Sequence, residues 1–461
     1  MTAEIPAPTT VSAPSARPQP TLVVRTIAID DLPDGPAALI DLLPDARPLS
    51  WVRRGEGIVG WGEALRLETY GPGRFADAEA AWQEALARAV VRDEVHVPGA
   101  GPVAFGSFAF DDVVGADGDA RPCGVLIVPR VVVGRRGTTT WLTTIDATGS
   151  LSHSPGTHLL DPDGRTPVSS PGEVVEHPGA LGTEDWAAVV QEATRRIRDG
   201  EVDKVVLARD VVTTAERPVD ARWLLANLAQ NYPSCWTFSV DGLAGATPEL
   251  LVRSEKGLVT SRVLAGTIRR AAPLPDDGPD PAVFLASSSK DLEEHEYAVR
   301  SVADALEPFC SSMNVPDAPF VLHLPNVLHL ASDVTGVLGH TVAEESSEGR
   351  TPSSLALAAA LHPSAAVCGT PTTAAREMIR EIEGMDRGRY AGPVGWLGAD
   401  GDGEWGIALR CAEISHADPR TVRLFAGCGI VAASDSRAEL VESEAKLEPV
   451  RSALRGIWNH P

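Results

Sequence analysis

An irregular alternation of short strand-like and helical segments, running from Thr21 toward the C-terminus, constrains the fold most strongly. Helical spacing of apolar residues begins at Trp186 and is stopped by Gly200. No internal repeat, heptad pattern or glycine-rich phosphate loop interrupts the alternation. A mixture of this kind predicts an α+β fold with large sheets and covering helices. The expected strands lie at residues 21–27, 50–54, 57–59, 103–110, 123–133, 138–144 and 202–209, with a turn at 134–137 and a further helix at 75–91.

Four stretches of the sequence are expected to be irregular. Residues 1–20 are rich in Pro, Thr, Ala and Ser, which predicts a disordered tail. Residues 151–182 are rich in Pro, Gly, Ser and His, which predicts a long connection. Further loops are expected at residues 271–281 and 343–352.

Charge and cysteine content exclude several classes of protein. The net charge of −23, without a cluster of Lys and Arg, argues against a nucleic-acid partner. No apolar run reaches the length of about 18 residues that a transmembrane helix needs. The start of the chain lacks the pattern of a secretory signal. The six cysteines show no metal-ligand spacing, so we expect reduced thiols in a cytoplasmic protein.

Two ionisable residues stand in unusual settings. Lys204 would share one face of a strand with Val206 and Ala208. Such a lysine either snorkels at a sheet edge or lies in a pocket, where a shifted pKa would let it act as a general base. Glu249 follows Pro248 and precedes an apolar run. It is either a turn carboxylate or a proton donor.

Two other segments could contact a ligand. Residues 264–267, Leu-Ala-Gly-Thr, predict a turn of small residues whose backbone amides can approach a ligand closely. Residues 290–295 open a helix, and Glu294 lies near Ala298 on its wheel. Charges in a first helical turn also stabilise the helix dipole, which is the alternative for Glu294.

The C-terminal region holds the densest group of candidates. Glu439, Glu442 and Lys446 are spaced i, i+3 and i+7, on one helical face where two carboxylates could bind Mg²⁺. Two alternatives remain open: Glu439 could form a capping box with Ser436, and Glu442–Lys446 could be an ordinary surface pair. Residues 426–430, before this helix, offer backbone amides suited to an anion. Arg410 ends an apolar run and is either a structural ion-pair partner or a bidentate carboxylate ligand.

The order of these segments resembles the chorismate-utilising enzymes, which comprise isochorismate, salicylate, anthranilate and aminodeoxychorismate synthases. The resemblance is strong over residues 185–455 and looser before them. It implies one α+β domain of two large sheets flanked by helices, spanning residues 21–461. Within it, residues 21–182 form a variable part and 183–461 the catalytic part. The matching blocks are residues 204–209, 247–251, 264–267, 290–295, 361–371, 390–398, 407–412 and 425–446.

The resemblance also implies roles for individual residues. A magnesium ion would be bound by carboxylates, Glu294 and Glu442 directly and Glu439 through water. Lys204 would activate the attacking water, and Glu249 would protonate the departing hydroxyl. The chorismate carboxylates and ring would contact Gly266, Thr267, His329, Ala366, Val367, Tyr390, Arg410, the amides of Gly427 and Gly429, and Lys446.

A few positions favour isochorismate synthase within this family. Lys204 is typical of members that use water, whereas the ammonia-using anthranilate synthases carry glutamine there. Ala265 stands where aminodeoxychorismate synthases carry a nucleophilic lysine. Residues 51–62 resemble the isochorismate synthases of menaquinone synthesis. Salicylate synthases share Lys204 and Glu249 and are the alternative.

A non-catalytic subunit on the same fold is a further alternative, against which the retained acidic and basic residues argue. We expect a monomer that acts on chorismate without an obligate glutaminase partner. The product would feed either menaquinone or siderophore synthesis, which these residues do not distinguish.

Overall fold

The computed structural model describes residues 20–44, 47–112, 121–148, 160–161, 164–269, 281–324, 327–339 and 351–456. The tail expected at residues 1–20 lies outside these ranges except for its last residue. The loops expected at 271–281 and 343–352 also lie outside them except at their C-terminal ends.

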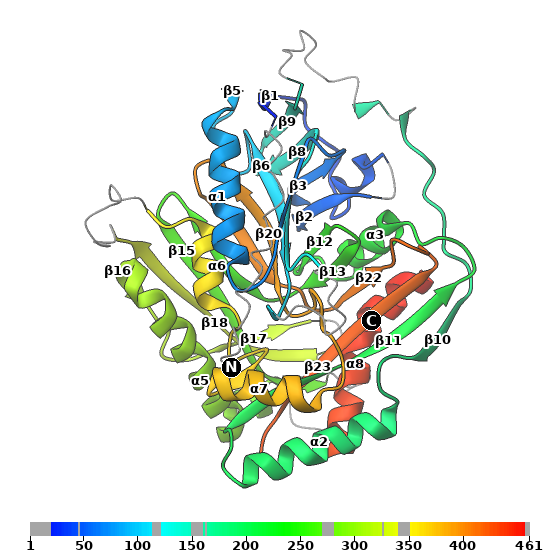
Figure 1. Ribbon diagram of the computed structural model, residues 1–461, viewed down its shortest axis with the longest axis vertical. Helices are drawn as coiled ribbons and strands as arrows, with labels where there is room; N and C mark the ends of the chain where they lie inside the picture. The colour runs from blue at the N-terminus through cyan, green and yellow to red at the C-terminus, as the bar shows by residue number, and fades with distance from the viewer. Residues whose placement is uncertain are drawn as a thin grey trace, which may run out of the picture.

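Within these ranges the strands form two large sheets, as the sequence predicts (Figure 1). Nearly all neighbouring strands are antiparallel, and β1 with β5 is a parallel pair. In spatial order the first sheet contains β10 (Val174–Pro178), β11 (Lys204–Ala215), β23 (Thr421–Ile430), β22 (Cys411–Ile414), β13 (Leu243–Thr247), β12 (Trp236–Val240), β2 (Leu49–Arg53), β3 (Glu56–Trp61), β8 (Val131–Arg136), β9 (Thr139–Asp146), β1 (Val23–Ala28) and β5 (Val90–Asp93), with β19 (Gly369–Thr370) beside β11.

The second sheet is built mainly from segments of the middle of the chain. In spatial order it contains β16 (Cys310–Asn314), β18 (Val327–Leu338), β15 (Leu258–Arg269), β14 (Leu250–Glu255), β21 (Gly403–Ile407), β20 (Pro393–Gly398), β6 (Val103–Phe108), β7 (Gly124–Val128) and β4 (Leu65–Thr69), with β17 (Phe320–His323) beside β18.

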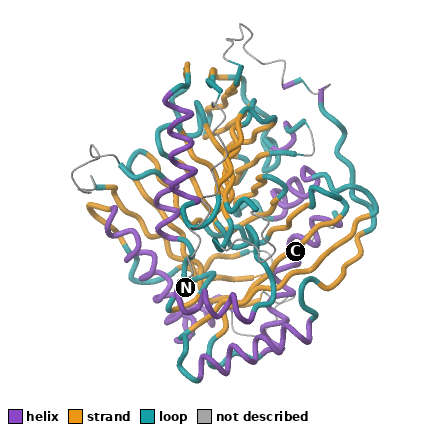
Figure 2. The backbone as a smooth tube through the Cα atoms, in the orientation of Figure 1, coloured by secondary structure: helices purple, strands orange, loops and turns teal. Residues whose placement is uncertain are grey.

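Helices lie outside the strands (Figure 2). Three of them, α2, α3 and α8, pack on the first sheet. Helices α2 and α3 each also pack on α8, and α7 packs on β11. The others, α1, α4, α5 and α6, pack on the second sheet. Their bounds are α1 (Arg74–Ala87), α2 (Thr183–Arg198), α3 (Ala221–Asn231), α4 (Pro281–Ser287), α5 (Ser289–Leu306), α6 (Ser354–Leu361), α7 (Thr372–Ile382) and α8 (Ser436–Arg455), with short 3-10 turns at Ile40–Leu42 and Glu307–Phe309.

The largest apolar core draws on both sheets. Trp51 and Phe425 from the first sheet share it with Phe105 and Trp405 from the second. A second core fills the space between the outer face of the first sheet and helices α3 and α8. Burial of large aromatic side chains therefore joins the two sheets into one body.

Two expected elements are corrected where the chain passes from one sheet to the other. Residues 123–133, expected to be one strand, form β7 in the second sheet and β8 in the first. The break falls at Pro129, which lacks the N–H that a continuous strand would use. The expected turn at 134–137 is also misplaced, because β8 runs on to Arg136 and pairs with β9 across a turn at Gly137.

Three segments for which no strand was predicted contain or belong to strands. The expected connection at residues 151–182 contains β10, an edge strand on β11. The expected turn at 264–267 lies inside β15, where the pairing with β18 shifts at Gly266, whose φ is +79°. This is a β-bulge, which the glycine permits. Residues 426–430 end strand β23, paired with β11. Each is set by pairing with distant strands, which local sequence does not reveal.

All six cysteines are free thiols, five of them buried. Of the helices in the described ranges, none combines the length and the apolar character that crossing a membrane demands.

Candidate active site

A cavity of about 200 Å³ brings together most of the predicted site residues. Its walls come from β11, the crossing between β13 and β14, β15, β18, β23, α8 and the segments that precede β19, β20 and β22. The side chains of Thr267 in β15 and Glu294 in α5 lie outside the described part of the structure. The predicted residues that line the cavity are Lys204, Glu249, Gly266, His329, Ala366, Val367, Tyr390, Arg410, Gly427, Gly429, Glu439, Glu442 and Lys446.

Lys204 and Glu249 meet in this cavity although they lie in different parts of the fold. Lys204 begins β11 and is half-buried, so it is neither a fully exposed edge residue nor fully enclosed. Glu249 lies where the chain leaves β13 in the first sheet and enters β14 in the second. Its side chain is buried. The crossing therefore points a carboxyl group into the space between the sheets.

The environment of Glu249 favours its protonated form. Burial raises the pKa of this carboxyl to about 8, although Lys204, the backbone N–H of Leu264, Lys446 and Arg410 all act to lower it. The unfavourable free energy of desolvating the carboxylate is larger than the stabilisation that these groups provide. The group therefore carries a proton at neutral pH and can donate it.

Arg410 provides a cation at the cavity wall. The residue has φ +48°, an unusual value for a non-glycine residue. Among the described residues, Nη1 of its buried guanidinium has no hydrogen-bond partner. An unpaired buried donor is costly, so this group is suited to receive an anionic ligand. Burial lowers the pKa of Arg410 from its ordinary value.

His329 is held as a neutral imidazole beside Arg410. Burial, together with the charges of Arg410 and Lys446, lowers its pKa well below the ordinary value. Its Nε2 lies 3.4 Å from Nη2 of Arg410. Because arginine can only donate, Nε2 must be the acceptor, and the ring proton is on Nδ1. His329 therefore orients the guanidinium rather than adding a second positive charge.

Tyr390 stacks on Phe425 at 5.0 Å between ring centroids. Burial raises the pKa of its hydroxyl, which stays neutral. A Cβ on Gly427 would lie 3.1 Å from this hydroxyl oxygen and equally close to the Leu207 carbonyl. Glycine at this position therefore leaves room for the tyrosine at the cavity wall.

The amides of Gly427 and Gly429 are available although both residues lie in a strand. Their partners in β11 are Ala208 and Val206. The N–H groups of these partners bond elsewhere, Ala208 to Oε2 of Glu383 at 2.8 Å and Val206 to the Cys368 carbonyl at 2.8 Å. Both pairs are therefore the non-hydrogen-bonded kind, in which the strand's own N–H groups point away from its partner. Gly427 and Gly429 direct theirs away from β11.

On α8 the carboxylates of Glu439 and Glu442 lie one turn apart, with Lys446 a turn further. The ligand atoms of Cys428, Glu439 and Glu442 lie within 4.8 Å of one another. Nζ of Lys446 is 2.6 Å from Oε1 of Glu442 and donates to the Gly427 carbonyl at 2.8 Å. The i, i+4 pair that remained open from the sequence is therefore formed, and both of its side chains line the cavity.

This donor set fits a magnesium ion. Burial alone would raise the pKa of Glu442, but attraction to Lys446 and Arg410 lowers it below the ordinary value, so the carboxylate is charged. Burial raises the pKa of the Cys428 thiol, which therefore stays protonated. A neutral thiol is a poor magnesium ligand, so the two carboxylates are the suitable donors, with water and substrate oxygens completing the shell.

Glu439 does not cap α8, the alternative its sequence position allowed. The N-cap is Asp435, whose side chain accepts from the N–H groups of Arg437 and Ala438. The Glu439 carboxylate instead accepts from the Ser434 hydroxyl at 2.7 Å.

Several cavity residues were not predicted from the sequence. Arg387 is the charged one among them, and its i, i+4 spacing from Glu383 was a signal that could have drawn attention to it. The others are apolar and carry no chemical signal in a single sequence. The unpredicted residues are Val206, Ala208, Pro248, Arg387, Ala391, Leu409 and Phe425, whereas Leu264, Ala265 and Ala426 belong to segments that the sequence had singled out.

Comparison with known proteins identifies the family of this chain. The isochorismate synthase DhbC of Bacillus subtilis is 40% identical over 59% of this chain and 68% of its own length. The isochorismate synthase MenF of the same organism is 32% identical over 77% of this chain and 75% of its own. The crystal structure of DhbC from Bacillus anthracis has a TM-score of 0.71 at 30% identity, covering 92% of this chain and all of the other. The profile of the family described as chorismate binding enzyme matches residues 45–455, so this chain belongs to that family.

Proposed function

We propose that the protein is an isochorismate synthase, which adds water at C2 of chorismate and expels the C4 hydroxyl. The observation that carries the proposal is the protonated, buried Glu249 in the same cavity as Lys204. An acid and a base held in one cavity suit a reaction that needs both in one turnover. The names of the relatives with 32% and 40% identity support the same activity.

The substrate carboxylates would be bound by fixed donors on the cavity wall. The free Nη1 of Arg410 is suited to one carboxylate, with the Tyr390 hydroxyl beside it. Lys446 and the amides of Gly427 and Gly429 supply further donors. These groups also offset the negative charge of −23 that would otherwise repel a dianion.

Glu442 and Glu294 would hold Mg²⁺ directly, with Glu439 nearby acting through water. When bound, the ion supplies positive charge that neutralises a substrate carboxylate and fixes its position. The chain's own part is to keep Glu442 ionised, and Lys446 does this in the absence of the ion.

Lys204 would take a proton from water as the oxygen attacks C2. The ring double bonds shift, the bond from C4 to its hydroxyl breaks, and Glu249 gives that hydroxyl a proton. One water enters and one leaves, so atoms and protons balance. Apolar walls from Val206, Ala265 and Phe425 would limit other water in the cavity.

The test is product analysis after incubation with chorismate and Mg²⁺. Isochorismate should form in water alone, and ammonium should yield no amino product. Stoichiometric pyruvate release by the purified protein would instead establish the salicylate synthase alternative. Recovery of unchanged chorismate would favour the non-catalytic alternative. We further propose that a monomer is sufficient, so activity per chain should not change on dilution or need a glutaminase subunit.

A further inference from the structure

A buried ion pair joins Glu383 to Arg387, a residue of the cavity wall, just after α7. The two side chains are 1% and 3% exposed. Nε of Arg387 donates to Oε1 of Glu383, and Nη2 donates to Oε2, both at 2.6 Å. The guanidinium also lies 4.2 Å above the Phe110 ring. The guanidinium and the carboxylate therefore form a bidentate ion pair in an apolar environment.

The pair bonds four residues that line the cavity, which belong to three segments of the chain. Oε2 of Glu383 accepts from the Ala208 N–H at 2.8 Å. Arg387 donates to the Val206 carbonyl at 2.6 Å and the Val367 carbonyl at 2.9 Å. Its own carbonyl accepts from the Tyr390 N–H at 3.0 Å. Each of these partners lines the cavity.

These bonds satisfy backbone groups that have no partner in the sheet. Ala208 and Val206 face Gly427 and Gly429 in non-hydrogen-bonded pairs. Their backbone N–H and C=O groups therefore point away from β23 and need other partners. Because desolvation offsets much of the attraction in a buried ion pair, apolar side chains of the same size could replace it with little loss of stability. Apolar side chains could not form the hydrogen bonds to the Ala208 N–H, the Val206 carbonyl and the Val367 carbonyl. They would therefore not fix β11 relative to the segment before β19.

We propose that Glu383 and Arg387 are positioning residues, which set the place of Lys204 and Tyr390 in the cavity through β11 and the turn at residues 387–390. The kinetic test of this inference measures the turnover of chorismate, so it rests on the proposed function. Lys204 is two residues from Val206 on the same strand, so a shift of β11 moves its amine. A displacement of about 1 Å can lower a rate by about a hundredfold.

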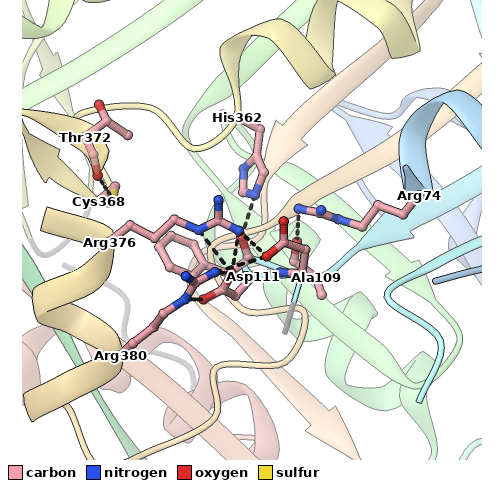
Figure 3. A network of polar contacts seen from close by, with 10 residues as sticks. Arg74, Ala109, Asp111, His362, Cys368, Thr372, Arg376 and Arg380 are labelled. Carbon is pink, nitrogen blue, oxygen red and sulfur yellow. Dashed lines mark hydrogen bonds and ion pairs between the residues drawn. The ribbon is translucent and has the colours of Figure 1, made fainter. Parts of the chain in front are cut away.

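A second cluster on α7 provides a matched control (Figure 3). Arg376 and Arg380 of this helix both form ion pairs with Asp111 and Asp112. Neither arginine lines the cavity. Arg380 is 39% exposed. It therefore offers an ion pair close in sequence, on α7, whose hydrogen bonds within the described residues go to Asp111 and Asp112 and not to β11.

The experiment compares Arg387→Lys with Arg380→Lys. Arg387→Lys keeps the charge but cannot reproduce the fork of donors. We expect kcat per folded protein to fall about a hundredfold with KM changed less than about fivefold. Exchange of the Ala208 amide hydrogen should accelerate. Arg380→Lys should leave kcat and the exchange rate of the Ala208 amide unchanged. Near-normal kcat in Arg387→Lys would overturn the inference.

A double variant covers the case in which the single one misfolds. Glu383→Gln with Arg387→Met removes both charges and leaves no unpaired ion. It should fold and show the same loss of kcat. If wild type converts chorismate to another product, the proposed function fails, but the ratio of variant to wild-type rate still tests positioning. If wild type is inert, unchanged exchange at Ala208 in Arg387→Lys would reject the inference by itself.

Discussion

Nζ of Lys446 lies 2.6 Å from Oε1 of Glu442, one turn away on α8. The carboxylate best placed for a metal is therefore already paired with a lysine. Attraction to Glu442 raises the pKa of Lys446 above its ordinary value, although its burial acts to lower it. A bound cation must share or displace this lysine, which can then turn to a substrate carboxylate. Metal and substrate binding are thus expected to be coupled.

Glu442→Gln should weaken magnesium binding without unfolding the protein, because it keeps the shape of the side chain and removes its charge. We expect the Mg²⁺ concentration for half-maximal turnover to rise at least about tenfold. Glu448→Gln, on the same helix outside the cavity, is the control. EDTA should abolish wild-type activity, and added Mg²⁺ should restore it. Full turnover in excess EDTA would reject the metal assignment.

Lys204→Ala should lose about 10²- to 10⁴-fold in turnover, which is what general base catalysis contributes. Lys204→Gln should be equally inactive, because an amide cannot take the proton from water. Both variants should still bind chorismate and Mg²⁺ in calorimetry. If Lys204→Ala retained near-normal turnover, the lysine would serve only the structure of β11.

The pH dependence of kcat/KM should report Glu249. Its pKa of about 8 lies above the ordinary value, so the acid form prevails below pH 8 and is lost as pH rises through it. Activity should fall about tenfold per pH unit above this point. Glu249→Gln should be inactive across the range. A rate that stays constant up to pH 10 would exclude Glu249 as the acid.

The same carboxyl should reduce stability at neutral pH. Below pH 4.5 both the folded and unfolded forms are protonated. Between pH 4.5 and about 8 only the unfolded form ionises, which favours unfolding by up to about 1.4 kcal/mol per pH unit. Glu249→Gln should therefore be more stable than wild type at pH 8, by on the order of several kcal/mol, with the difference shrinking toward pH 5. Urea unfolding at these pH values measures it, and a constant difference would contradict the raised pKa.

Substitutions of Asp435 and Glu439 should have different effects, the first on the stability of α8 and the second on the magnesium requirement. Asp435→Ala removes the N-cap of α8 and should lower the free energy of unfolding by about 1 kcal/mol. Glu439→Ala leaves the cap intact and should raise the Mg²⁺ requirement instead. Thermal unfolding and magnesium titrations of both variants test this, and the reverse pattern would restore Glu439 as the cap.

Some of this protein was accessible from the sequence alone. The two-sheet α+β fold and membership of the chorismate-utilising family are confirmed. The family resemblance rests on short ordered blocks, and Lys204, Glu249 and Glu442 belong to these blocks. Helix α2 was also predictable, because its apolar spacing and the glycine that stops it are local signals.

Other features were decided only by the tertiary structure. Residues 123–133 divide between two sheets, and residues 426–430 form a strand because β11 lies beside them. The proton on Glu249 depends on burial between the sheets, and the role inferred for Arg387 depends on backbone groups far away in the sequence. Strand pairing and desolvation both depend on residues that are distant in the sequence. The sequence therefore supplies the residue types for a site, and the fold determines the contacts and the charge of each residue.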